Sequence, residues 1–291
     1  MKMKFKKKDS YSISQKNVKI LKEGKIKIPK GPKVPIEKFI ADSVNRTVAL
    51  PLDAIIAQES LTSAKESPTI DLQMSTMWDV ITRPSFTAEA VLGGSVNTAV
   101  IVVNKKNSGE AFTFDDGTIV GSLMRTSLLP AIYKRIMDNW VDINDKKNLS
   151  TNVLFIPDIL VYLDKSTGEV LRYPYKVNLL LIAEPSKKDF EESPEYKDKE
   201  VTKEELVERI VSDVAEAAVK CGVSNLVIAP YCHKWLVNDI YITAEKWKDM
   251  CTFQPICVAI EQIVFAINKE DLYIIFKSRT SGVDSSPSLS L

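Results

Sequence analysis

The sequence predicts an α/β fold in which helices cover both faces of a mixed, mostly parallel sheet. Two observations lead to this prediction. Residues 98–104 and 224–230 are short, largely apolar runs, as expected of strands covered on both faces. Segments with helical periodicity stand between such runs, and this alternation is typical of a three-layer α/β domain. The 291 residues allow one large domain with extensions.

Residues 34–185 contain four of the six predicted strands. Residues 34–48 have a helical pattern, and residues 68–74 could form an edge strand before the core. After the strand at 98–104, residues 122–140 carry an apolar helical stripe, with Pro130 as an early-turn kink. The next strands are predicted at 152–164 and 175–185, joined by a turn.

The second half contains the clearest helix. Thr202 and Glu205 have the spacing of a capping box, and Gly222 stands where the helical pattern ends. The charged stretch 187–200 before it is predicted to be a surface loop. The remaining predicted elements are a strand at 224–230, helices around 243–251 and near 254–262, and a strand at 263–268.

Charge divides the chain into three predicted regions. Residues 1–33 hold twelve lysines against two acidic residues, a local charge of +10, so the remainder carries −9. We expect this stretch to be a basic, flexible arm, followed by one domain over 34–277 and a disordered Ser-rich tail over 278–291. The arm lacks arginine and has two aromatics, which favours a solubilising tail over nucleic-acid binding. Binding to nucleic acid or to an acidic surface stays open as the alternative.

Several function classes are disfavoured. No apolar run is long enough for a membrane span, and no apolar segment follows the basic N-terminus as in a secretory signal, so we expect an intracellular (cytoplasmic) protein. The cysteines at 221, 232, 251 and 257 match no paired zinc pattern. We therefore expect neither a metal nor a cofactor. A histidine-centred triad would depend on His233 alone.

Two loops occupy the places where α/β sheets bind ligands. In such sheets, ligands lie at the carboxyl ends of the strands, near helix N-termini. The first loop lies in residues 104–127, after the strand at 98–104, and the second covers residues 230–239, after the strand at 224–230. The candidate site is therefore predicted between these two loops.

The run from about residue 98 to residue 268 resembles the microbial-type poly(ADP-ribose) glycohydrolases, which are macrodomain enzymes that cleave ADP-ribose from protein-linked chains. The resemblance implies a macrodomain-like fold with an N-terminal extension and an ADP-ribose site in the two loops. It lies mainly in hydrophobic framework positions, so it indicates fold more than activity. The stretches that carry it are KNSGEAF (106–112), SLMRTSLL (122–129), FIPDILVYLD (155–164), LVIAPYCHKWLVND (226–239), IVFAI (263–267) and, more loosely, TIDLQMSTMWDVI (69–81).

The ligand loops depart from that family. Its members carry three consecutive glycines, because the backbone must approach ADP-ribose closely, whereas this chain has Gly109-Glu110-Ala111. The family then places Gln-Glu-Glu at the start of the next helix, and one of these glutamates is the general acid. An ungapped alignment puts Ile119, Val120 and Gly121 at those positions, and none of them can protonate a leaving oxygen. The glycine-rich diphosphate loop is represented here by Cys232, His233, Lys234 and, further on, Val237.

These departures favour a catalytically silent, glycohydrolase-like macrodomain that serves as a structural or protein-interaction module. A diverged glycohydrolase would need Glu110, Asp115 or Asp116 to have taken over the acid role. Asp116-Gly117 more simply predicts a hairpin turn, and Glu110 would repel a phosphate.

The main alternative is a reader that binds ADP-ribose or a related nucleotide without hydrolysing it. The ligand-binding residues it would use are Asn104, Gly109, Phe112, Lys234, Asn238 and Asp239.

Overall fold

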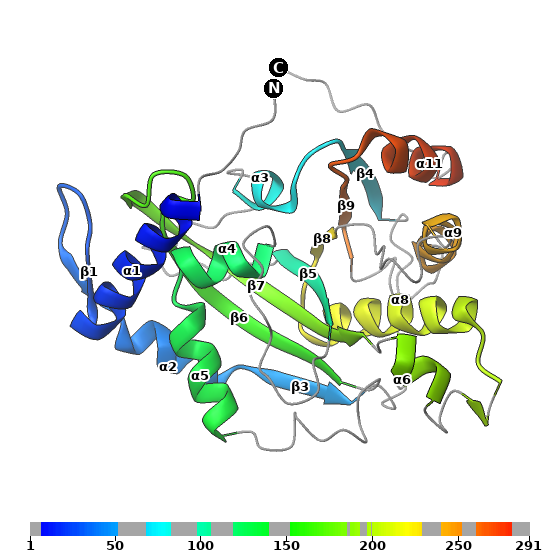
Figure 1. Cartoon of the computed structure of the whole chain (residues 1–291), viewed down its shortest axis with the longest axis horizontal. Coiled ribbons are helices and arrows are strands. Elements are labelled where there is room, and N and C mark those ends of the chain that lie inside the picture. Colours follow the sequence, from blue (N-terminus) through cyan, green and yellow to red (C-terminus); the bar gives the residue numbers. More distant parts are fainter. Residues whose placement is uncertain are drawn as a thin grey trace.

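The fold is built on a seven-stranded sheet (Figure 1). The computed structural model describes residues 7–51, 68–82, 98–105, 119–139, 152–184, 187–192, 197–198, 200–228, 240–251 and 260–280. Across the sheet the strands follow the order β3 (Val48–Pro51), β6 (Asn152–Leu163), β7 (Val170–Glu184), β5 (Thr98–Lys105), β8 (Asn225–Ile228), β9 (Gln262–Ala266) and β4 (Thr69–Gln73). The five strands from β7 to β4 are parallel, and β6 is antiparallel to both of its neighbours. The predicted mixed, mostly parallel sheet is therefore confirmed.

Helices cover both faces of the sheet. On one face lie α1 (Lys7–Glu23), α2 (Glu37–Asn45), α3 (Met77–Ile81), α4 (Ile119–Thr126) and α5 (Leu129–Asn139). On the other lie α8 (Lys203–Lys220), α9 (Ile240–Cys251) and α11 (Glu270–Thr280). The sheet has a hydrophobic core on each face: the first core cluster lies under α1–α5, and the second lies under α8, α9 and α11. Strand residues alternate between them, so Leu179 and Leu181 belong to the first core cluster and Leu180 belongs to the second. This is the predicted three-layer architecture.

The predicted capping box starts α8. The Glu205 backbone N–H donates to Thr202 Oγ1 at 3.2 Å, and the Thr202 N–H donates to Glu205 Oε2 at 2.7 Å. Gly222 follows the helix with φ of 67°, the left-handed conformation that glycine tolerates best. Both ends of this helix were therefore predicted correctly from local sequence.

The prediction of one helix over 122–140 was wrong, because the chain forms α4 and α5 with a break at Ser127 and Leu128. There the backbone pairs with β6: the Leu128 N–H donates to the Leu160 carbonyl at 3.0 Å. The Leu129 N–H donates to Ser127 Oγ at 3.1 Å, which starts α5. Pro130 then lies in the first turn of α5, where a missing N–H costs no helical bond.

Two other sequence expectations also need correction. The stretch 187–200, expected to be a loop, includes helix α6 (Lys187–Glu192). Residue 262, expected to end a helix, starts strand β9, and residues 252–259 lie outside the described part of the chain. Within the described residues, no helix is long and apolar enough to cross a membrane.

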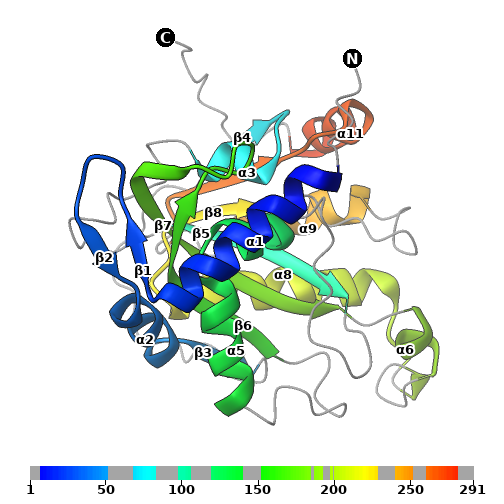
Figure 2. The same cartoon turned by 60° about the vertical axis from the view of Figure 1, so that its left-hand side comes forward.

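Within its described residues, 7–33, the N-terminal stretch expected to be a flexible arm forms helix α1 and the start of a β-hairpin. Helix α1 runs across the face formed by α4 and β6, with Ile13 and Asn17 buried against them (Figure 2). Asn17 Nδ2 donates to the carbonyls of Met124 at 2.9 Å and Ser127 at 3.1 Å, and its Oδ1 accepts from the Tyr162 hydroxyl. The expectation failed because it considered charge alone, whereas α1 also presents a buried face. The domain boundaries at 33 and 277 remain predictions.

After α1 the chain forms a two-stranded antiparallel hairpin, β1 (Lys25–Lys27) and β2 (Lys33–Pro35), separate from the main sheet. Ile26 is fully buried and belongs to the first core cluster, so the hairpin is fixed to the body of the protein. Its place at the edge of the molecule is visible in Figures 1 and 2.

Candidate functional site

The predicted site follows two neighbouring strands in the middle of the sheet. Strand β5 lies between β7 and β8 and is parallel to both. Asn104 stands one residue before the end of β5, opposite Ala183 of β7, so its backbone lies at the carboxyl edge of the sheet. This is where ligands bind in open α/β sheets. Of the six predicted ligand-binding residues, Asn104 is the one that the structure places.

The other five predicted ligand residues lie outside the described residues. They are Gly109, Phe112, Lys234, Asn238 and Asp239. The same holds for Glu110, Asp115, Asp116, Cys232 and His233. Whether these side chains converge with Asn104 therefore remains a prediction.

The start of α4 is described, and it is apolar and buried. Ile119 is 7% exposed and Val120 is 4% exposed, and both belong to the first core cluster with Trp78 and Leu123. Gly121 is buried as well, and the first turn of α4 contains no acidic residue. Helix α4 begins at Ile119, so this residue and Val120 are not in the second arm of a hairpin after Asp115 and Asp116. The first turn of α4 thus contributes core packing and no proton donor.

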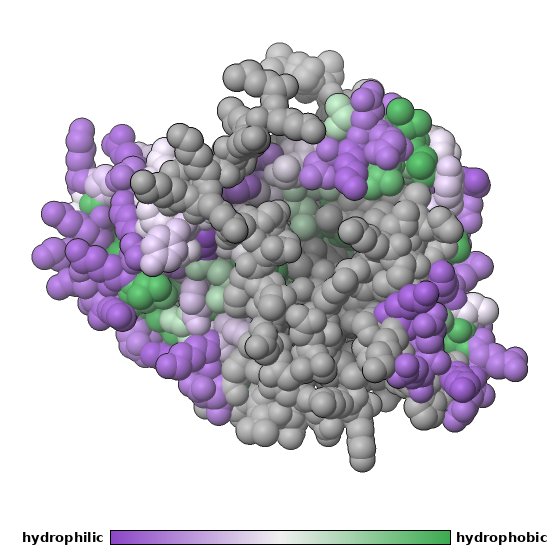
Figure 3. Space-filling model, viewed as in Figure 1, coloured by the Kyte–Doolittle hydropathy of each residue, from purple (hydrophilic) through white to green (hydrophobic). Residues whose placement is uncertain are grey.

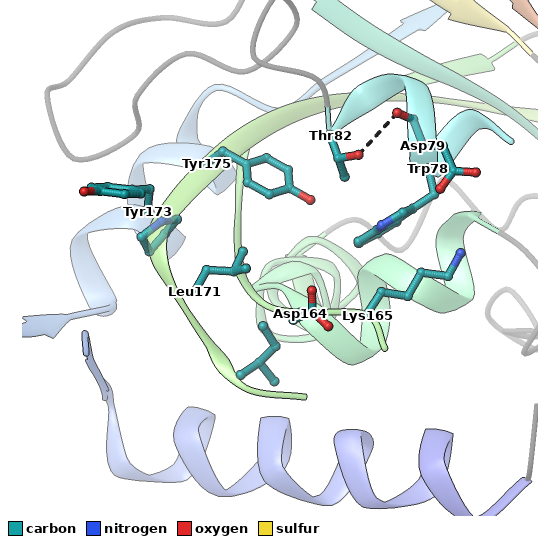
Figure 4. A pocket seen from close by; sticks show the side chains of 10 residues that line it. Trp78, Asp79, Thr82, Asp164, Lys165, Leu171, Tyr173 and Tyr175 are labelled. Atoms are coloured by element: carbon teal, nitrogen blue, oxygen red, sulfur yellow. Dashed lines mark hydrogen bonds between the residues drawn. The ribbon is translucent and has the colours of Figure 1, made fainter. Parts of the chain in front are cut away.

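A pocket of about 390 Å³ lies on the same side of the sheet, between α3 and the turn that joins β6 to β7 (Figure 4). Trp78, 9% exposed, forms one wall, and the Lys165 ammonium stands 5.4 Å from the centre of its ring. Tyr175 and Leu171 of β7 face them, while Tyr173 lies at the rim and is largely exposed.

Local hydrogen bonds hold both walls of this pocket. Thr76 caps α3 by accepting the Asp79 N–H at 3.2 Å, and Thr82 Oγ1 donates to the Asp79 carbonyl at 3.3 Å. On the other wall, Asp164 accepts from the backbone and side chains of Ser166 and Thr167 at 2.7–3.0 Å. The Asp164 carboxylate is therefore occupied in shaping the turn.

The pocket combines a partly desolvated cation with a neutral phenol. Burial lowers the pKa of Lys165; the negative charge of Asp79 opposes this shift and the positive charge of Arg125 adds to it. Burial, and then the charge of Asp164, raises the pKa of Tyr175, so the phenol stays protonated. Such a pocket can accept a small planar or anionic group. Its described lining contains no nucleophile paired with a base.

A charged cluster surrounds buried Asp158 in the middle of β6. Asp158 accepts from Arg46 and pairs with Lys176 at 3.5 Å. Its backbone N–H donates to Asn178 Oδ1 at 2.8 Å, and its φ of 52° marks an irregularity in the pairing of β6 with β7. The Asp158 carboxylate is thus neutralised by side chains of two other elements, which indicates a structural role at this bulge.

Metal and thiol chemistry find no support among the described side chains. No group of three or more histidine, cysteine or carboxylate side chains in that part of the chain could hold a metal ion. Cys251 is buried, and burial raises the pKa of Cys221 to about 11, which keeps this thiol protonated at neutral pH.

Sequence reasoning missed the pocket beside Trp78. Its two walls come from segments more than 80 residues apart, and Lys165 was read as part of a turn. The available signal was the tryptophan itself, which stands four residues after the end of a predicted strand. Nothing in the local sequence shows that the β6–β7 turn meets it.

No protein family model matches the chain, and no curated protein matches it. Solved structures do. A poly(ADP-ribose) glycohydrolase from Thermomonospora curvata is similar at a TM-score of 0.68 and 20% identity, over 94% of this chain and 100% of that one. The enzyme from Deinococcus radiodurans in apo form gives 0.61 and 16% identity, over 88% and 100%. Its complex with ADP-ribose gives 0.60 and 17% identity, over 84% and 98%.

These similarities confirm the fold expected from the sequence. The chain has a macrodomain-like fold of the poly(ADP-ribose) glycohydrolase type, and the likeness extends over most of its length. At this level of identity the likeness concerns the fold alone.

Proposed function

We propose that the protein is a catalytically silent member of this fold type that serves as a structural or protein-interaction module. The observation that carries the proposal is the apolar first turn of α4. The resemblance would place two glutamates at Val120 and Gly121, after a glutamine at Ile119. All three residues are buried, and Ile119 and Val120 pack into the core. Cleavage of a glycosidic bond needs a carboxyl group that protonates the leaving oxygen.

Replacement of the acid is accompanied by changes in both ligand loops. Glu110 and Ala111 stand in place of two glycines, and Lys234 stands in the loop that glycines keep open in the family. A carboxylate at 110 would repel a diphosphate, while side chains in the second loop would occupy ligand space. Because both the catalytic acid and the loop glycines of the family are replaced, a structural or protein-interaction role is favoured over catalysis.

An activity assay tests this proposal. The full chain, in excess over poly(ADP-ribosyl)ated protein, should release no ADP-ribose above the no-enzyme control between about pH 5 and pH 9, a range that brackets the usual pKa values of catalytic acids. A poly(ADP-ribose) glycohydrolase such as the T. curvata protein would serve as the positive control. Turnover that disappears in Glu110→Gln or Asp116→Asn would instead show a relocated acid and a working glycohydrolase.

A second candidate function is a reader that binds ADP-ribose or a related nucleotide without hydrolysis. It is favoured by the D. radiodurans structure of the same fold, which holds ADP-ribose. In this chain Asn104 has its backbone at the carboxyl edge of the sheet, and Lys234 and Asn238 follow the neighbouring strand.

Calorimetric titration with ADP-ribose separates the two candidates. A dissociation constant below about 100 µM, equivalent to roughly 5.5 kcal/mol, would favour the reader. Asn104→Ala and Lys234→Ala should then weaken binding, while exposed Lys269→Ala should not. No heat of binding up to millimolar ADP-ribose would favour the structural module.

A further inference from the structure

The β1–β2 hairpin presents lysines on one face. Ile26 and Val34 are paired across the hairpin, and Ile26 is buried against the core. Because side chains alternate along a strand, Lys25 and Lys27 point to the opposite side, and Lys33 lies directly across from Lys27. All three lysines are exposed. The outward face of the hairpin is therefore a small platform of positive charge.

This platform is electrostatically unfavourable in the protein itself. Like charges directly opposite each other on two strands destabilise a sheet, and Lys27 faces Lys33. Among the described residues, no carboxylate pairs with Lys25, Lys27 or Lys33. By contrast, Lys16 on α1 pairs with Glu169 at 3.4 Å. A negatively charged partner would relieve the repulsion that the fold leaves in place.

The tip of the hairpin carries a further lysine in a strained conformation. The Gly31 N–H donates to the Ile28 carbonyl at 3.0 Å, which closes a turn with Pro29 and Lys30 at its centre. Lys30 has φ of 58°, although this turn position favours glycine or asparagine. Its side chain is exposed, so no burial explains the choice of residue. The tip thus adds a fourth exposed lysine to the hairpin.

The hairpin is also accessible. It stands at the edge of the molecule, beyond α1 and α2 (Figures 1 and 2). The corresponding edge of the surface is largely hydrophilic in Figure 3. The lysine platform is therefore free to meet a large partner.

We propose that the lysine platform, consisting of Lys25, Lys27 and Lys33, together with exposed Lys30 at the hairpin tip, binds the phosphodiester backbone of a nucleic-acid duplex. The hairpin contains no arginine and no aromatic residue. As for the whole N-terminal stretch, this composition counts against base reading and base stacking, but the lysines remain suited to phosphate contacts, which hold a duplex without reading its sequence. Protein–protein interfaces, in contrast, are depleted of lysine and enriched in aromatics, methionine and arginine. A repeating polyanion is thus the partner that this composition fits. The proposal does not depend on whether the macrodomain binds ADP-ribose.

Binding to duplexes at several salt concentrations tests the proposal. The probes are fluorescent 20-base-pair DNA and RNA duplexes of unrelated sequences, titrated with the full chain. We expect binding that is indifferent to sequence. The slope of log K against log salt is negative, and each phosphate contact contributes about 0.9 to its magnitude. The triple variant Lys25→Gln/Lys27→Gln/Lys33→Gln should therefore make this slope shallower by about 2.7. A preference for DNA or RNA would identify the natural duplex.

The matched control is Lys197→Gln/Lys203→Gln/Lys269→Gln, which removes three exposed lysines outside the hairpin. It should bind like the wild type. Equal losses in the two triple variants would overturn the proposal, because they would indicate a net-charge effect. Binding to phosphatidylserine vesicles or to a polyglutamate peptide, with none to either duplex, would overturn it in favour of a membrane or an acidic protein.

A charge reversal separates binding from folding. Lys27→Glu places an acidic residue opposite Lys33, so the hairpin should be at least as stable as in the wild type. Duplex affinity at about 50 mM salt should nevertheless fall more than tenfold, because two charges are lost at the centre of the platform. Unchanged affinity in this variant would overturn the proposal whatever its melting temperature.

Discussion

Three glycines with the same backbone conformation differ in what surrounds them. Gly24, Gly168 and Gly222 all have φ of 67°. A Cβ atom at Gly24 or Gly222 would meet nothing within 4 Å, whereas one at Gly168 would lie 2.9 Å from Cγ1 of Ile13 on α1. Gly168 thus serves two purposes: it allows the left-handed turn between β6 and β7, and it lets α1 approach that turn.

This difference predicts an ordered set of stabilities. Gly24→Ala and Gly222→Ala should each lower the free energy of unfolding by about 1 kcal/mol, because they introduce backbone strain alone. Gly168→Ala should cost about 1–3 kcal/mol more, because overpacking adds to that strain. Urea unfolding monitored by circular dichroism would measure all three.

The double variant Gly168→Ala/Ile13→Ala provides the control. Removing the Ile13 side chain should relieve the clash, so the two substitutions together should cost less than the sum of their separate effects. Equal losses at all three glycines would show that α1 does not approach the turn as closely as described.

At the scale of elements, α1 is joined to the domain through a buried amide. Asn17, 1% exposed, satisfies the carbonyls of Met124 and Ser127 at the end of α4, where the helix breaks and leaves them without helical partners. The Tyr162 hydroxyl donates to the same side chain. One side chain on α1 therefore completes the hydrogen bonding of α4 and β6.

Asn17→Ala should destabilise the protein by about 2–4 kcal/mol, because it leaves two carbonyls and a hydroxyl buried without their partner. Gln15→Ala, on the exposed side of the same helix, is the control and should cost less than about 0.5 kcal/mol. Thermal unfolding would compare the two variants. A loss for Asn17→Ala no larger than that for Gln15→Ala would contradict the docking of α1.

The sequence predicts individual elements well where their signals are local. The capping box at Thr202 and the apolar strand 224–230 each contain their evidence within a few residues. The break between α4 and α5 could not be predicted, because it depends on Leu128 pairing with Leu160, which a helical stripe does not reveal. The packing of α1 against the domain could not be predicted for the same reason, because buried Asn17 has its hydrogen-bond partners more than 100 residues away.

At the scale of the whole molecule, the layered architecture followed from alternating apolar strands and helical segments, and the structural neighbours confirm the macrodomain-like fold. The candidate site is less accessible to prediction. The sequence places Asn104 at the end of a central strand, but it does not show which loop residues meet it. The pocket beside Trp78 was missed, because it arises where helix α3 meets the distant β6–β7 turn.

The proposed catalytic silence depends on the start of α4 being part of the core, with no room for an acid. Val120→Glu compared with its uncharged counterpart Val120→Gln tests this most directly. Burial of the new carboxyl group raises its pKa in the folded state. The free energy of unfolding of Val120→Glu should therefore be highest below about pH 4.3, the usual pKa of glutamate, and should fall as the pH rises.

Equilibrium unfolding of the two variants between pH 4 and pH 7 is the decisive measurement. Val120→Gln should cost about 2–3 kcal/mol at both pH values. Val120→Glu should match it near pH 4 and be less stable by up to about 3.7 kcal/mol at pH 7, the limit set by 1.36 kcal/mol per pH unit. Equal stability of the two variants at pH 7 would contradict the account, because position 120 would then accept an ionised carboxylate and would not be part of the core.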